Sequence, residues 1–263
     1  MHKRYGLLLA AILCLATCAK AQSALDGTWK FDKDTAKFPT KPDEYLLKDG
    51  MYHCKTCVPQ LDVKADGQDH SVTGHPYYDT ANIKMVDDHS IEETYKKSGK
   101  VVSTSKSTVS ADGSTVTFEF SDSSASSGDP VTGKGQATRV GKVPAAAHAI
   151  SGSWRTAKMD TISDNAMTVT FKVNGDTLAM SNPTGQAYTA KLDGTDAPYK
   201  GDPGTTSVSV KKMGPNSIEE TDKRDGKVIS VSRLTVSADG KTLKVQWQDK
   251  LHGTSGEVSA TKM

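Results

Sequence analysis

Residues 90–113 read SIEETYKKSGKVVSTSKSTVSADG, and residues 217–240 read SIEETDKRDGKVISVSRLTVSADG. The two stretches lie 127 residues apart and share Ser-Ile-Glu-Glu-Thr, Gly-Lys-Val and Thr-Val-Ser-Ala-Asp-Gly at the same spacing. Identities that keep one offset over such a length indicate a duplicated structural unit, because shared composition alone does not preserve spacing. The chain therefore contains one fold twice.

Each copy has the pattern of an antiparallel β-sheet. Short stretches rich in Val, Thr, Ile, Tyr and Phe are separated by turn dipeptides such as Asp49-Gly50, Asp112-Gly113 and Asn174-Gly175. Gly and Asn reach the positive φ angles that tight hairpins require. Apolar and polar residues alternate over 115–120 and again over 243–247, so one face of each sheet is buried. The pattern predicts an all-β protein of up-and-down hairpins.

The stretch 101–109 is polar on both of its faces, because Ser103, Ser105 and Ser107 alternate with Thr and Lys. Two positions in a sheet would produce this pattern. One is an edge strand, and the other is a barrel wall that lines a wet interior. A tight hydrophobic cavity would not be compatible with it.

The N-terminus has the pattern of an export signal. Met1-His2-Lys3-Arg4 is basic, residues 7–15 are apolar but too few to span a bilayer, and Ala19-Lys20-Ala21 resembles a cleavage site. We expect a signal peptide over 1–21 and a mature protein in the periplasm or outside the cell. The residues before Cys18 also resemble a lipobox, and outer-membrane anchoring through an acylated Cys18 is the alternative.

The two copies set the domain plan. Each opens on a Gly-x-Trp sequence, at 27–29 and at 152–154. We predict one unit over 22–140, a linker over 141–149 and a second unit over 150–263. Each unit is long enough to form its own core.

The charge balance argues against polyanionic partners. The chain has 33 Lys and Arg against 31 Asp and Glu, and Lys3, Arg4 and Lys20 belong to the predicted signal peptide. The mature chain thus has 30 basic residues, 31 acidic residues and a net charge of about −1. No nucleic-acid partner, no transmembrane segment and no cofactor is expected.

The Gly-x-Trp opening and the basic residue near the end of each unit carry a resemblance. With about eight antiparallel strands between them, they resemble the lipocalin-like calycin barrels, and more narrowly the uncharacterised secreted bacterial proteins with a GTWK opening. The resemblance implies two tandem antiparallel up-and-down lipocalin-like β-barrels joined by a short linker. It also implies that each Trp closes its barrel beneath a basic side chain, Trp29 under Arg139 and Trp154 under Lys262.

The resemblance does not extend to lipid binding. The fatty-acid-binding branch has a helix-turn-helix lid after its first strand, and the prolines within 32–48 disfavour such a lid here. The Arg and Tyr cluster that holds a fatty-acid carboxylate in that branch is not identifiable in this sequence.

Cys54 and Cys57 are the cysteines that remain after signal cleavage. In an exported protein the default for such a pair is a disulfide, which would close a small ring around Lys55-Thr56. The spacing of Cys54, Cys57, His70 and His75 formally matches a zinc finger. That motif requires a helix, whereas Gly74 and Pro76 favour turns. A β-supported zinc or copper site, or a redox site, remains an alternative, with candidate metal ligands His53, Cys54, Cys57, His70 and His75.

Enzyme signatures are missing from the sequence. It contains no Gly-x-Ser-x-Gly elbow, no His-Glu-x-x-His and no phosphate-binding glycine loop. Glu92-Glu93 and Glu219-Glu220 are neighbours on strands, so each pair points to opposite faces and leaves one carboxylate inward. We therefore expect a protein without catalytic residues.

Two functions fit this sequence. The first is the binding of a small molecule in one or both barrels, which predicts an open pocket with mixed polar walls. The alternative is a structural or adhesive protein of the cell envelope, which predicts filled barrels.

Overall fold

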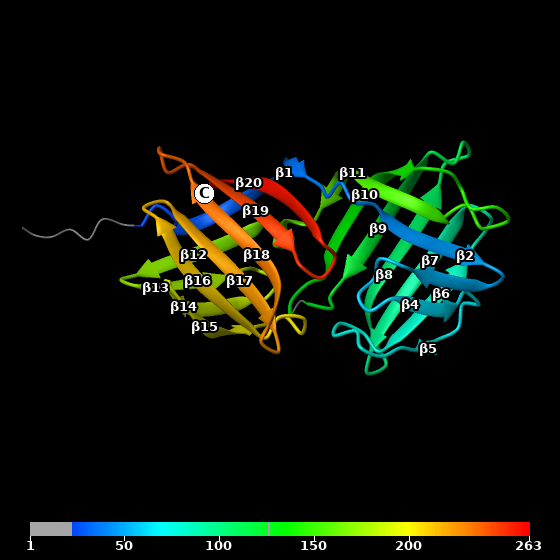
Figure 1. Cartoon of the computed structure of the whole chain (residues 1–263), viewed down its shortest axis with the longest axis horizontal. Coiled ribbons are helices and arrows are strands. Elements are labelled where there is room, and N and C mark those ends of the chain that lie inside the picture. Colours follow the sequence, from blue (N-terminus) through cyan, green and yellow to red (C-terminus); the bar gives the residue numbers. More distant parts are fainter. Residues whose placement is uncertain (1–22, 126) are drawn as a thin grey trace, which may run out of the picture.

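The structure is a computed structural model and describes residues 23–125 and 127–263. The predicted signal peptide over 1–21, together with Cys18, lies outside the described residues. Within these ranges, twenty β-strands form two antiparallel sheets of ten strands each, which lie side by side (Figure 1). The described residues contain no α-helix and one short 3₁₀ helix, η1 (Asp164–Ala166). The predicted all-β class with two antiparallel barrels is confirmed, with ten strands in each sheet rather than about eight.

Barrel one is the nearly closed sheet. A two-residue strand forms one of its two edges, and an isolated bridge between Asp66 and Lys84 narrows the gap between those edges. Its strands are β2 (Asp43–Lys48), β3 (Met51–Cys54), β4 (Leu61–Lys64), β5 (His70–Ser71), β6 (Thr80–Met85), β7 (Ser90–Lys97), β8 (Lys100–Val109), β9 (Thr115–Asp122), β10 (Val131–Val140) and β11 (Gly152–Ile162).

Barrel two is a closed sheet. Its strands are β1 (Gly27–Lys37), β12 (Thr168–Asn174), β13 (Thr177–Ser181), β14 (Ala187–Lys191), β15 (Asp193–Lys200), β16 (Ser207–Gly214), β17 (Ser217–Arg224), β18 (Lys227–Val236), β19 (Thr242–Asp249) and β20 (Thr254–Lys262).

The opening strands of the two repeats are exchanged between the barrels. β1, which opens the first repeat, pairs with β12 and β20 of barrel two. β11, which opens the second repeat, pairs with β10 and β2 of barrel one. In Figure 1 the blue strand β1 accordingly lies among the later strands of barrel two, whereas β2 lies in barrel one. The expectation that each repeat closes its own barrel was wrong in this respect.

Short connections explain the exchange. Residues 38–42 join β1 to β2 and include Pro39 and Pro42. Proline keeps the residue before it extended, and this segment has no Gly or Asn for a tight hairpin. The chain therefore runs on into the other barrel instead of turning back. Because the repeats are so similar, an exchanged strand finds nearly the same neighbours, and the exchange costs little.

The exchange changes the role of the predicted linker. Residues 141–149 lie in the loop between β10 and β11, which are neighbours within barrel one. The chain passes between the barrels at 38–42 and at 163–167 instead. Barrel one is thus continuous from 43 to 162 and is inserted between β1 and β12 of barrel two.

The tryptophans close the barrels with exchanged partners. The guanidinium carbon of Arg139 lies 4.0 Å from the ring centroid of Trp154, and Lys262 Nζ lies 4.9 Å from that of Trp29. Both indoles are almost completely buried. The expected pairs, Trp29 with Arg139 and Trp154 with Lys262, were wrong because each Trp is on an exchanged strand and each basic residue is not.

Candidate functional site

Barrel one contains a cavity of about 240 Å³ that is partly open to solvent. Ser105 and Ser107 of β8 belong to its wall, and β8 is paired on both sides, with β7 and β9. The polar stretch 101–109 is therefore a barrel wall and not an edge strand. The lining residues are Asp43, Tyr45, Tyr52, Ile91, Glu93, Ser105, Ser107, Val116, Phe118, Ala137, Ile150, Trp154 and Thr156.

Both repeats contribute to this cavity. Ile150, Trp154 and Thr156 lie at the start of the second repeat, while the other lining residues come from the first. Trp154 is buried, and its indole N–H donates to the carbonyl oxygen of Ile150 at 2.7 Å. The exchange of β11 is therefore what completes the wall.

Glu93 on β7 is the inward carboxylate that strand alternation predicts. Its Oε2 accepts a hydrogen bond from the Ser105 hydroxyl at 2.6 Å, and its Oε1 accepts one from the Tyr95 hydroxyl at 3.1 Å. Its neighbour Glu92 points outward, where Lys84 Nζ and Lys106 Nζ lie 3.6 and 3.8 Å from its two carboxylate oxygens. Glu92 thus has lysine partners outside the barrel, whereas its neighbour Glu93 has hydroxyl partners inside it.

Tyrosines surround Glu93. The rings of Tyr45 and Tyr52 are stacked with centroids 6.1 Å apart, and Tyr95 lies against Tyr78 at 4.5 Å. Burial, and then the charge of Glu93, hold the pKa of Tyr52 and Tyr95 well above the usual value of 10. The same two causes raise the pKa of Tyr78 to about 12. These phenols therefore stay neutral hydrogen-bond donors at physiological pH.

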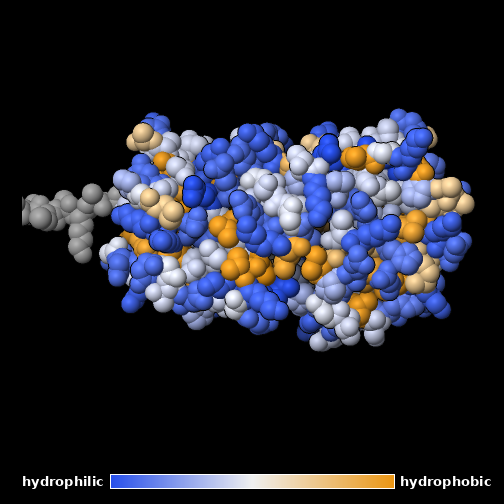
Figure 2. Space-filling view, in the orientation of Figure 1, coloured by the Kyte–Doolittle hydropathy of each residue, from blue (hydrophilic) through white to orange (hydrophobic). Residues whose placement is uncertain are grey.

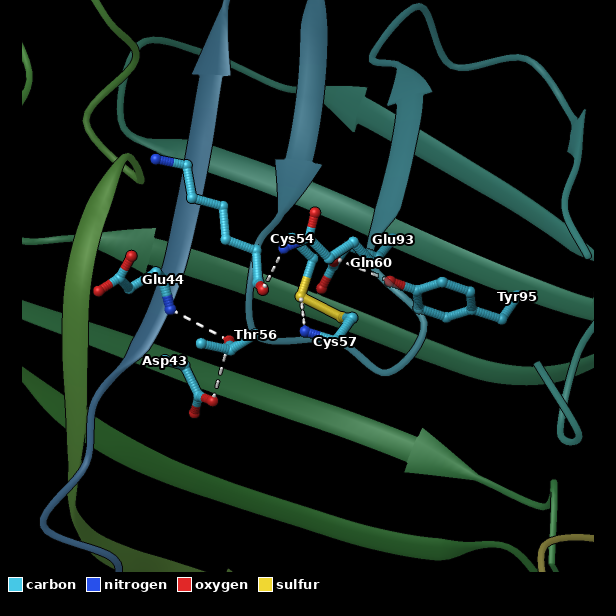
Figure 3. Close-up of a disulfide and its surroundings, with 9 residues drawn as sticks. Asp43, Glu44, Cys54, Thr56, Cys57, Gln60, Glu93 and Tyr95 are labelled. Atoms are coloured by element: carbon cyan, nitrogen blue, oxygen red, sulfur yellow. Dashed lines mark hydrogen bonds between the residues drawn. A yellow bond between two sulfur atoms is a disulfide. The ribbon is translucent and has the colours of Figure 1, made fainter. Parts of the chain in front are cut away.

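The predicted disulfide is present. Cys54 and Cys57 are joined by an S–S bond, and the backbone N–H of Cys57 lies 3.1 Å from the Cys54 sulfur (Figure 3). The Thr56 hydroxyl accepts a hydrogen bond from the backbone N–H of Glu44 and donates one to Asp43. The bridge therefore fixes a turn that lies against the start of β2, next to Asp43, which lines the cavity.

The structure does not bring the candidate metal ligands together. Cys54 and Cys57 are bonded to each other, His53 is hydrogen-bonded to Asp62, and His70 to Asp66 at 2.8 Å. His75 stacks on Tyr78 with ring centroids 4.5 Å apart, and burial lowers its pKa. Among the described residues, no group of three or more His, Cys, Asp and Glu side chains is placed to hold a metal ion.

Barrel two holds a different arrangement at the equivalent positions. Glu220, the counterpart of Glu93, accepts a hydrogen bond from the Tyr188 hydroxyl at 2.6 Å. Asp222, two residues further along β17, has a buried Oδ1 without a hydrogen-bond partner among the described residues. Burial, and then the negative charges of Glu220 and Asp202, raise the pKa of Asp222 to about 8. Barrel one has Tyr95 at this position.

Sequence reasoning missed the tyrosines and Asp222. Residues 91, 93 and 95 on β7, and 218, 220 and 222 on β17, share the inward face. Extending the alternation beyond the Glu pair by two residues would have identified Tyr95 and Asp222. Tyr45 and Tyr52 carry no comparable signal, because aromatic residues are frequent in any strand.

A groove of about 620 Å³ lies between the two barrels. Its lining includes Val58 and His75 from barrel one, and Ile229 and Trp247 from barrel two. Figure 2 shows that apolar residues also gather at the junction of the barrels on the face in view, within a mostly hydrophilic surface. The Tyr78 ring borders this groove and contacts Tyr95, which in turn reaches Glu93 in the barrel interior.

Comparison with known proteins gives no assignment, since no protein-family model matches the chain and no curated protein shows significant similarity to it. Over residues 23–125 and 127–263, no helix is long and apolar enough to cross a membrane. The barrel fold is established by the structure itself, and any function must be argued from the site.

Proposed function

We propose that this protein is an exported, lipocalin-like binding protein that holds a small molecule in the cavity of barrel one and catalyses no reaction. The cavity is the observation that carries the proposal. Pockets of this kind combine apolar walls with a few polar groups that orient the ligand. Here Phe118 and Trp154 supply apolar surface, while Glu93 and Ser105 supply polar atoms.

The size of the cavity limits the ligand. Pockets for drug-sized ligands span about 300–1,000 Å³, and the cavity of about 240 Å³ lies below that range. This space therefore suits a ligand smaller than a typical drug molecule. The proposal therefore concerns metabolites of that size and not lipids with long chains.

Two further observations support an exported protein. The basic, apolar and small-residue segments at the N-terminus follow the order of a signal peptide. The Cys54–Cys57 disulfide suits an oxidising compartment.

A cavity-filling variant tests the binding function. Ser107 faces the cavity, and barrel two has a buried Leu234 at the equivalent position, so Ser107→Leu introduces a side chain that the fold already accommodates. We expect saturation-transfer NMR with a library of small metabolites to find compounds that bind the mature protein. Ser107→Leu should weaken their binding by at least about tenfold, because it removes the space they occupy.

Thr104→Leu is the matched control, because Thr104 lies on the exposed face of the same strand. It should bind the same compounds as the wild type. A library in which nothing binds, or compounds that bind wild type and Ser107→Leu equally, would contradict the proposal.

A further inference from the structure

The wall of the barrel-one cavity contains acidic side chains but no basic ones. Its thirteen lining residues include two carboxylates, Asp43 and Glu93, and no Lys, Arg or His. Arg139 lies near Trp154 but does not line the cavity. Its guanidinium donates to the carbonyl oxygens of Gly113, Ala149 and Ser151 at 2.5 to 2.6 Å. A ligand in barrel one therefore meets two carboxyl groups and no basic side chain on the cavity wall.

Glu93 has no cationic partner in the described chain. Its hydrogen-bond partners are the neutral hydroxyls of Ser105, Tyr95 and Tyr52, whereas Glu92 on the outer face lies between two lysines. Glu93 is half-buried, and a carboxylate that is partly shielded from water is stabilised most strongly by an opposite charge. A carboxylate can accept about four hydrogen bonds, so Glu93 can still accept one from a ligand.

Aromatic rings complete the environment. Tyr45, Tyr52, Phe118 and Trp154 line the same cavity as Glu93. The face of an aromatic ring attracts a cation, and the attraction grows when water is excluded. A carboxylate enclosed by such rings is suited to an ammonium group, and it would repel an anionic ligand.

From these observations we infer that the ligand of barrel one is a small organic ammonium compound with an apolar or aromatic body. The ammonium group donates hydrogen bonds to Glu93, and the body lies against Phe118 and Trp154. This inference rests on the proposed binding function and adds the chemical class of the ligand. It excludes fatty acids and other carboxylates as the principal ligands.

Three probes of matched shape test the charge of the ligand. Phenethylamine is a cation at neutral pH, 2-phenylethanol is its neutral counterpart, and phenylacetate is an anion. Isothermal titration of the mature protein at pH 7 should give a dissociation constant below about 1 mM for phenethylamine. The alcohol should bind at least about tenfold more weakly, and phenylacetate should show no binding.

Glu93→Gln removes the charge and keeps the shape of the side chain. It should reduce phenethylamine binding at least about tenfold and leave the alcohol unchanged. Glu220→Gln is the matched control, because Glu220 occupies the equivalent position in barrel two and lines no part of this cavity. It should bind phenethylamine as the wild type does.

The outcomes separate the ligand class from the binding function. Equal binding of amine and alcohol, an unchanged affinity in Glu93→Gln, or no binding of phenethylamine would overturn the inference. These results would leave the proposed binding function intact. That function is tested separately, by whether Ser107→Leu weakens the binding of metabolites.

Discussion

Glu93 and Glu220 occupy one position of the repeated unit and have different surroundings. Glu93 lies in a cavity beside hydroxyls, while Glu220 is paired with Tyr188 and followed on the same face by Asp222. A single substitution in the repeat, Tyr95 in one copy and Asp222 in the other, thus gives barrel two a second inward carboxyl group. Two like charges in a buried space cannot both be ionised cheaply.

We predict that Asp222 makes stability depend on pH. In the unfolded chain an Asp has a pKa of about 3.9, whereas in the folded protein that pKa is about 8. Between these values the folded state binds more protons at Asp222, so the contribution of this residue to stability is most favourable below about pH 4 and is lost as pH rises towards 8. Asp222→Asn should remove this loss. In urea unfolding it should be more stable than wild type at pH 8 and similar to it at pH 4.

Asp225→Asn is the control for this prediction, because Asp225 lies in the exposed turn after β17. It should leave the pH dependence unchanged. An Asp222→Asn variant that shows the same pH dependence of stability as the wild type would contradict the role given to Asp222.

At the residue scale, the sequence indicated which residue types close the barrels but not how they pair. Gly-x-Trp and a basic residue on the last strand were sufficient to identify Trp29, Trp154, Arg139 and Lys262 as neighbours of the barrel ends. The two copies are so similar that either tryptophan fits either partner, so local pattern cannot distinguish them. Only the path of the chain between the barrels decides the pairing.

At the scale of elements, alternation predicted which strand faces are buried. Val116 and Phe118 of β9, and Leu243 and Val245 of β19, point into the two cores as expected. The close packing of Phe118 against its cross-strand partner Gly135 was less predictable. A Cβ atom at Gly135 would lie 2.7 Å from the Phe118 ring, so this position requires glycine. A strand pattern alone does not show which cross-strand neighbour is glycine.

The disulfide turn between β3 and β4 gives a prediction at this scale. For a loop as short as 54–57, the loss of loop-closure entropy in the unfolded chain is worth about 2 kcal/mol. Replacing both cysteines by alanine should therefore lower the melting temperature of barrel one by about 5–10 °C. Differential scanning calorimetry measures this shift.

Reduction of the wild type with dithiothreitol should lower this melting temperature by a similar amount. It breaks the disulfide without replacing the cysteine side chains, so it distinguishes the effect of the bond from that of the substitutions. The binding of phenethylamine should survive in the reduced protein, because neither cysteine lines the cavity. An unchanged melting temperature in both the variant and the reduced protein would show that the bridge does not stabilise barrel one.

At the scale of the whole molecule, the sequence repeat predicted two barrels but not the exchange of strands between them. Internal similarity shows that a unit occurs twice, but an exchanged and an unexchanged arrangement contain the same strands and nearly the same contacts. The two arrangements differ in the path of two connections of five residues each, at 38–42 and 163–167. The exchange also places Trp154 and Thr156 of the second repeat in the cavity of barrel one, so the binding site belongs to the pair of repeats.

Cysteine trapping of β1 tests this exchange most directly. Thr28 is paired with Thr170 of barrel two, with their hydroxyl oxygens 2.9 Å apart, so Thr28→Cys with Thr170→Cys should form a disulfide. In an unexchanged fold Thr28 would take the place of Ser153, which is paired with Glu44. We predict that mass spectrometric mapping finds the bond between positions 28 and 170, and none in the variant with Thr28→Cys and Glu44→Cys. A bond between positions 28 and 44, with none between 28 and 170, would contradict the exchanged structure and the cavity built on it.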